Sequence, residues 1–222
     1  MELKQSRDHG GQKSVAHVTD FKNGKHYMSS IVGHALISSA IFARKHEIKS
    51  GGAAFMCMFF IGLGISPDMD YLVYWVFDYQ IEPRVTHSIL FCFVIGLIAS
   101  CAKKFVLKNT FISVSHGLFY TASFSHLILD LLVGVHPMPL FWPINSNLIK
   151  LPFGILPSAG HIDIKNIYLW RNILIELVIL IPVSMLISCK LKTILFQRYK
   201  AMRYVFYIAL VVGMFVGIGL KR

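Results

Sequence analysis

Acidic residues are scarce in this chain of 222 residues, which has 11 Asp and Glu against 22 Lys and Arg. Charged residues make up only 15% of the sequence, hydrophobic residues make up 55%, and the mean hydropathy is +0.60. Soluble domains carry about a quarter charged residues, so this composition excludes an ordinary soluble protein and favours lipid as the surrounding solvent. The net charge of +11 does not indicate nucleic acid, because the basic residues cluster at the ends of apolar runs, where they meet anionic headgroups.

Cysteine is also sparse, and no two cysteines are close enough to form a CxxC pair. This spacing excludes a disulfide framework and a thiolate metal site. Internal repeats and low-complexity segments are absent as well. We interpret the cysteines, which lie in or beside apolar runs, as small hydrophobic residues: Cys57, Cys92, Cys101 and Cys189.

Six apolar runs follow a polar tail at 1–27, in which the histidines have no ligand spacing. A transmembrane helix needs about 20 mostly apolar residues, so the first two runs are short and are expected to be tilted, re-entrant or partly buried in protein. We predict an all-α, polytopic membrane helix bundle of about six transmembrane or re-entrant helices, with residues 28–222 as one membrane-embedded domain. The runs cover residues 28–43, 52–66, 86–102, 111–135, 167–189 and 202–220.

Basic residues mark three short loops, at 44–50, 103–109 and 190–201. Six spans place these loops on one side, which the positive-inside rule makes cytoplasmic. Loops 66–86 and 134–166 then share the other side, and the length of the second loop favours a packed, functional segment. The basic tail conflicts with this topology unless the first run is re-entrant.

Histidine and aspartate side chains collect at the outer ends of these runs, which is an unusual place for them. His126 and Asp130 are spaced i, i+4, so a helix puts both on one face. Charges at membrane depth are costly unless they are paired or bound to metal, and imidazole with carboxylate suits zinc or manganese. We therefore predict a divalent metal site, with zinc as the expected ion, from His34, Asp68, Asp70, His87, His126 and Asp130.

Each of these residues also has a structural explanation when it is considered alone. His126 and Asp130 would then be a hydrogen-bonded pair that joins helices, and Asp68 and Asp70 would be the acidic residues favoured in a first helical turn. His87 would be an interfacial histidine. The shared depth of the whole set favours the metal site over these separate explanations.

The order of these residues resembles the membrane-bound metal-dependent hydrolases that include the LexA-regulated inner-membrane protein YdjM. The resemblance covers residues 28–185 and departs from the usual pattern at Ser66 and at Glu82-Pro83. Glu82 stands where relatives have a histidine, and Arg84 takes the place of the basic residue. The matching elements are His34, Pro67-Asp68-x-Asp70, Thr86-His87-Ser88, Ser125-His126-x-x-x-Asp130, "PLFWP" at 139–143 and "RNILIELVILIP" with Glu176.

The resemblance implies a multi-pass protein of the bacterial inner membrane that hydrolyses its substrate with a metal-activated water. By analogy with zinc phospholipases C and single-strand nucleases, we expect the substrate to be a phosphoester. A lipid-linked phosphoester could reach the site sideways from the bilayer. Asp70 or Asp68 would act as general base, and Arg84 or Arg171 would hold the substrate anion. Thr86, Ser88 and Glu176 are expected to orient the ligands.

Two other functions would use the same histidines and aspartates. A haem or redox protein would take His34, His87 and His126 as axial ligands, although haem needs no aspartate and the chain has no CxxCH. An ion transporter would line its path with these residues, although transporters often show repeats. A catalytically inactive relative that senses or scaffolds is the third alternative.

Overall fold

The computed structural model describes residues 30–44, 51–77, 79, 83–106, 114–134, 137–152, 154–157, 165–188 and 200–219. The polar tail, Cys189, Glu82 and most of the three basic loops lie outside these residues, so their predicted roles stay predictions. The described chain is helical, and its only β pairing is a single antiparallel bridge between Met138 and Ile149. The predicted all-α fold is therefore confirmed.

Each of the six predicted apolar runs forms a helix. These helices are α2 (Ile31–Ala43), α3 (Gly51–Ile65), α5 (Ile89–Val106), α6 (His116–Val133), α7 (Ile167–Ile187) and α9 (Lys200–Gly219). Two helical stretches, Gly51–Tyr71 and Ile167–Ile187, are long and apolar enough to cross a membrane, whereas Ile31–Ala43 and Ile89–Lys103 are apolar but shorter.

A short irregular segment follows α3 and carries two of the candidate residues. The chain continues from α3 into the 3-10 turn η1 (Ser66–Asp68) and then directly into α4 (Met69–Phe77). Pro67 has no N–H for a helical hydrogen bond, which favours such a local departure from α geometry. A second 3-10 turn, η2 (Val85–His87), immediately precedes α5.

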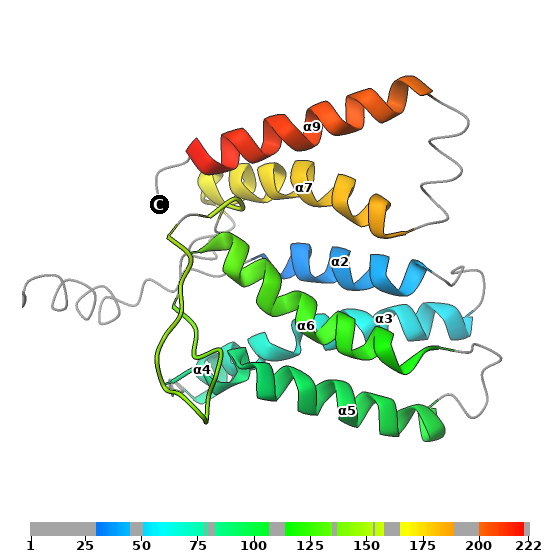
Figure 1. The fold of residues 1–222 in the computed structure, drawn as a ribbon, viewed down its shortest axis with the longest axis vertical. Helices are drawn as coiled ribbons and strands as arrows, with labels where there is room; N and C mark the ends of the chain where they lie inside the picture. The colour runs from blue at the N-terminus through cyan, green and yellow to red at the C-terminus, as the bar shows by residue number, and fades with distance from the viewer. Residues whose placement is uncertain are drawn as a thin grey trace, which may run out of the picture.

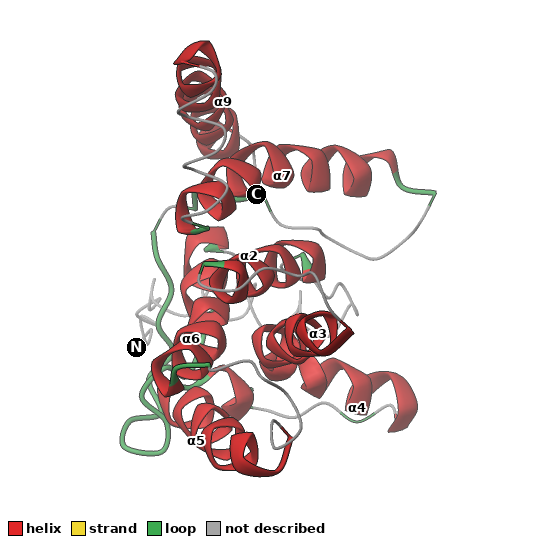
Figure 2. Cartoon of the chain, turned by 90° about the vertical axis from the view of Figure 1, so that its right-hand side faces the viewer, coloured by secondary structure: helices red, strands yellow, loops and turns green. Residues whose placement is uncertain are grey.

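The helices pack as a bundle in which α2, α3 and α6 contact one another, α5 packs on α6, and α7 lies between α2 and α9 (Figures 1 and 2). The centre is aromatic, since Phe60 packs on both Phe42 and Phe119 with ring centroids 5.3 Å apart in each pair. Helices α2, α3, α5 and α6 alternate in direction along the chain, so the start of α2, the end of α3, the start of α5 and the end of α6 meet at one end of the bundle (Figure 1).

The outward faces of the bundle are strongly apolar. Large hydrophobic side chains remain exposed along α5, α7 and α9, including Phe93, Leu174 and Phe215. A continuous surface of this kind is unfavourable in water, and it is the surface expected of helices that face lipid.

Glycine sets the close approach of α5 to α6. A Cβ added at Gly96 would lie 2.6 Å from Cδ1 and 3.2 Å from Cα of Tyr120. We expect Gly96→Ala to lower the free energy of unfolding by about 1–3 kcal/mol, because the helices must move apart. Thermal unfolding in detergent measures this loss. Gly62→Ala is the matched control, because nothing lies within 4 Å of the added Cβ; equal losses in the two variants would contradict the packing explanation.

Candidate metal centre

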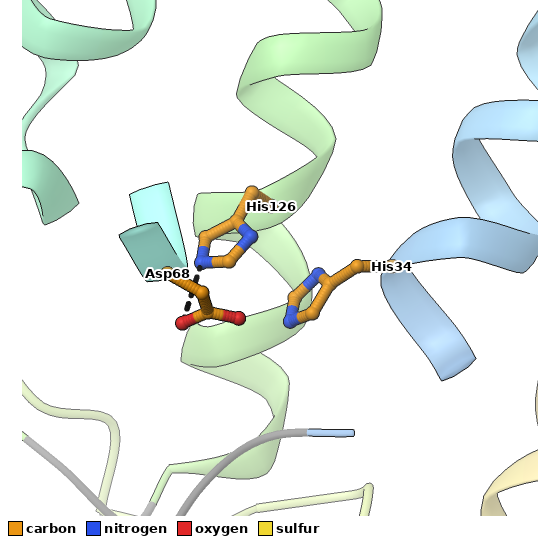
Figure 3. A group of neighbouring side chains, drawn as sticks. All are labelled: His34, Asp68 and His126. Atoms are coloured by element: carbon orange, nitrogen blue, oxygen red, sulfur yellow. Dashed lines mark ion pairs between the residues drawn. The ribbon is translucent and has the colours of Figure 1, made fainter. Parts of the chain in front are cut away.

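Four short segments bring the candidate ligands to the same end of the bundle. His34 lies in the first turn of α2, Asp68 ends η1, and His87 ends η2. His126 and Asp130 lie one turn apart in the second half of α6, which ends at Gly134, a residue with φ of 62°. Figure 3 shows His34 and Asp68 reaching towards His126 from different elements.

Two imidazoles and two carboxylates converge at the centre of the group. Nε2 of His126 lies 3.3 Å from Nε2 of His87. Oδ2 of Asp130 lies 3.2 Å from His126 Nε2 and 3.3 Å from His87 Nε2. Oδ1 of Asp68 lies 3.4 Å from His87 Nε2 and 3.7 Å from His126 Nε2. These two nitrogens and two oxygens, all potential metal-ligand atoms, therefore border the same small space.

His34 joins this group from the opposite side of His126. Its ring stacks on the His126 ring with centroids 3.9 Å apart and planes at 18°. Its Nε2 lies 3.2 Å from Oδ1 of Asp130. Two overlapping triplets, His34–Asp68–His126 and His87–His126–Asp130, each have potential ligand atoms within 4.8 Å of one another.

Hydrogen bonds to the Nδ1 atoms orient two of the imidazoles. His126 Nδ1 lies 2.7 Å from the carbonyl oxygen of Gly64, which can only accept, so Nδ1 carries the proton. His87 Nδ1 lies 3.0 Å from the Thr86 hydroxyl, which in turn donates to Asp70 at 3.2 Å. The hydroxyl must therefore accept from His87 Nδ1–H. In its neutral form, each imidazole with this tautomer would direct the Nε2 lone pair towards the central space.

Arg84 borders the group and is held by Asp70. Its Nε and Nη2 donate to the two oxygens of Asp70 at 2.6 and 3.1 Å, and Nη1 donates to the Tyr71 hydroxyl at 3.0 Å. Nη2 also lies 2.9 Å from His87 Nε2. Burial disfavours the charged guanidinium, but the hydrogen bonds and charge of Asp70 outweigh it and raise the pKa of Arg84 above its ordinary value. Arg84 is therefore a permanent cation beside the group.

Two predicted supporting residues act on the segments that carry the ligands. Ser88 accepts a hydrogen bond from Phe91 N at 3.1 Å and donates to the Val85 carbonyl at 2.7 Å, which fixes η2 at the start of α5. Glu176 is buried on α7 and packs against Gly33, the neighbour of His34 on α2. Its effect on the group therefore runs through the position of α2. Arg171 is exposed, and its guanidinium contacts Asn172 and the Tyr168 ring.

The group is buried and includes a carboxylate oxygen without a hydrogen-bond partner in the described part of the chain. The side chains of His34, His87 and His126 are at most 1% exposed. Oδ2 of Asp68 is buried and has no hydrogen-bond partner among the described residues. A buried carboxylate oxygen in this state is costly, which is a feature that functional sites retain.

Sequence reasoning missed two partners of the site. The Gly64 carbonyl is a backbone group in an apolar run, and no side-chain pattern signals it. Tyr71 directly follows Asp70, so its proximity to the motif was a usable signal; its ring lies under the Arg84 guanidinium at 4.4 Å. Both act through residues that the sequence had already indicated.

The Asp70–Arg84 ion pair can be tested by its contribution to stability. Asp70→Asn removes the nearer counter-charge of the guanidinium and leaves Asp68 Oδ1 at 3.6 Å, so we expect the free energy of unfolding to fall by about 1–3 kcal/mol. Arg84→Gln should also destabilise, and the double variant should lose less than the sum of the single losses. Unfolding of chelator-treated protein in detergent measures this cycle. Strictly additive losses would show that the pair does not contribute.

The comparisons with known proteins agree with this architecture. Residues 28–218 match the family described as YdjM inner membrane protein. No curated protein and no solved structure matches the chain. The match extends from α2 to the last turn of α9, and all six candidate metal ligands lie within it. The chain therefore belongs to the YdjM inner membrane protein family.

Proposed function

We propose that this inner membrane protein is a metal-dependent hydrolase of a phosphoester, with a lipid-linked phosphoester as the favoured substrate. The observation that carries the proposal is the convergence of His87 Nε2, His126 Nε2, Asp68 Oδ1 and Asp130 Oδ2 on one space. A divalent cation in this space would bind the imidazole nitrogens and neutralise both carboxylates.

The spacing of these donors fits zinc. Zinc bonds of about 2.0–2.2 Å give a regular tetrahedron with edges of roughly 3.3–3.6 Å. Five of the six donor separations in this group are 3.2–3.7 Å. The Nδ1 contacts of His126 and His87 are the orienting hydrogen bonds that ligand histidines usually have. We assign His87, His126, Asp68 and Asp130 as ligands. His34 belongs to the overlapping triplet that it forms with Asp68 and His126.

A bound zinc would supply Lewis acidity, and a water that replaces Asp68 as the fourth ligand would have a lowered pKa; the chain's own residues would do the rest. Asp68 Oδ2, which has no hydrogen-bond partner among the described residues, is the atom that we assign as proton acceptor. Asp70 has both oxygens engaged by Arg84 and Thr86, so we assign to it the positioning of Arg84. Arg84 would hold a phosphate oxygen through the guanidinium N–H that Asp70, Tyr71 and His87 leave unused.

The surroundings favour a substrate from the bilayer. The helices beside the group expose apolar side chains on α5 and α7, which is consistent with a multi-pass arrangement in lipid. Arg84, whose side chain is 24% exposed, is more open than the buried ligands. A headgroup phosphate could thus meet Arg84 while its acyl chains remain among the apolar faces.

The haem alternative receives no support from the geometry. The rings of His34 and His126 stack at 3.9 Å, which leaves no room for a macrocycle between them. An ion transporter would use the same residues as the hydrolase. The two functions can be distinguished because a transporter would move zinc into vesicles without hydrolysing a phosphoester.

Metal content is the first test of this proposal. We expect purified protein to carry stoichiometric zinc and the His126→Ala/Asp130→Ala variant to lose it, because two of the four ligands are removed. Elemental analysis under non-chelating conditions measures this. His116→Ala is the matched control, since His116 is exposed at the start of the same helix. A metal-free wild type would exclude the hydrolase, and metal retained in the double variant would exclude this ligand set.

Arg84 gives the second test. We expect Arg84→Gln to lower kcat/KM for a lipid phosphoester by about 10²-fold, as the loss of one charged donor to the reacting group does elsewhere, while zinc content is unchanged. Arg171→Gln, on the exposed face of α7, should leave kcat/KM unaltered. If the larger loss occurs in the Arg171 variant, the anion-binding assignment is wrong.

A further inference from the structure

The segment between α6 and α7 contains a loop whose base is fixed to the bundle. Met138 and Ile149 form a bridge with two hydrogen bonds of 2.8 Å and enclose residues 139–148. Leu140 accepts a hydrogen bond of 2.9 Å from Ile89 N, the first residue of α5. Met138 and Leu140 are buried against Cys92 and Leu127. The loop is therefore attached at the end of the bundle that holds the candidate metal centre.

The tip of this loop exposes apolar side chains. Ile144 is 94% exposed, Leu148 is 54% exposed and Phe141 is 50% exposed. Asn145, Ser146 and Asn147 lie between them in sequence. In water, the exposure of these apolar side chains would be unfavourable and nothing would offset it. Mixed aromatic, aliphatic and amide side chains instead suit the boundary between headgroups and acyl chains.

Charge and continuity also favour a membrane as the partner. Residues 138–150 contain no acidic side chain, and the exposed Lys150 follows the bridge. The loop meets α5 at Ile89, where the exposed apolar side chains of Ile89, Leu90 and Phe93 begin. The apolar surface of α5 thus continues onto the loop. The loop lies at the N-terminal end of α5, which is the level expected of the boundary between membrane and water.

We propose that the loop at 138–149 inserts its tip, with Ile144 foremost, into the headgroup–acyl boundary of the membrane that holds the protein. Because Leu140 binds the residue two positions after His87, this insertion sets the candidate metal centre at the level of lipid phosphates. The inference rests on the inner membrane location and does not require hydrolysis, so it stands or fails separately from the proposed reaction.

Trp142 lies in the loop and reports on its surroundings. The protein, with Trp75→Phe and Trp170→Phe, is placed in vesicles of phosphatidylethanolamine and phosphatidylglycerol that carry nitroxide at the headgroup or deep in the acyl chain. We expect severalfold stronger quenching of Trp142 by the shallow probe than by the deep one, and weak quenching by aqueous iodide. If this background does not fold, the difference between wild type and Trp142→Phe supplies the same signal.

Ile144→Asp tests the tip itself, because this side chain is almost fully exposed and its loss should not affect folding. We expect the shallow-probe quenching to fall at least twofold. Asn145→Asp is the control, since it adds the same charge and keeps an acceptor for the N–H of Asn147, now bonded at 2.8 Å. Equal effects of the two substitutions, or strong iodide quenching of the unsubstituted loop, would overturn the proposal.

Discussion

Mutual compensation of buried charge is the constraint on which the rest of the structure depends. Asp68 and Asp130 are carboxylates within a bundle whose surroundings are apolar, and each finds imidazole nitrogens from other elements within 4 Å. Neither carboxylate would be tolerated at that depth alone. The ends of α2, α3 and α6 and the turn before α5 must therefore meet, and the aromatic packing of Phe42, Phe60 and Phe119 holds the helix bodies in that arrangement.

Much of this could be predicted from the sequence because it depends on local patterns. Long apolar runs specify helices, and the i, i+4 spacing of His126 and Asp130 specifies a shared face whatever the packing. The placement of polar residues at run ends indicated a common depth. The direction of Asp70 could not be predicted, because it depends on the return of the chain to Arg84, fourteen residues later. The carbonyl of Gly64 is a backbone acceptor, and its role follows from the close approach of α3 to α2 that only glycine allows.

The surface of the molecule differs from that of a soluble protein, because apolar side chains cover the outward faces as well as the core. Its polar residues gather inside, at the end of the bundle, while Phe93, Leu174 and Phe215 remain on the outside. Lipid makes both halves of this arrangement favourable, because it solvates the outer faces and offers the inner carboxylates no water as an alternative partner. The membrane thereby strengthens the electrostatic contacts at the candidate centre.

The hydrogen bond between His126 and the Gly64 carbonyl has an evolutionary and mechanical consequence. Its acceptor is part of the peptide backbone, yet it depends on glycine at position 64, because a Cβ there would collide with the Ser38 side chain and displace α3 from α2. Only a sliding of α3 along α6 would release the ring. The tautomer of this buried imidazole thus depends on the relative position of α3 and α6, and a force that moves one helix along the other would change the hydrogen bond of His126.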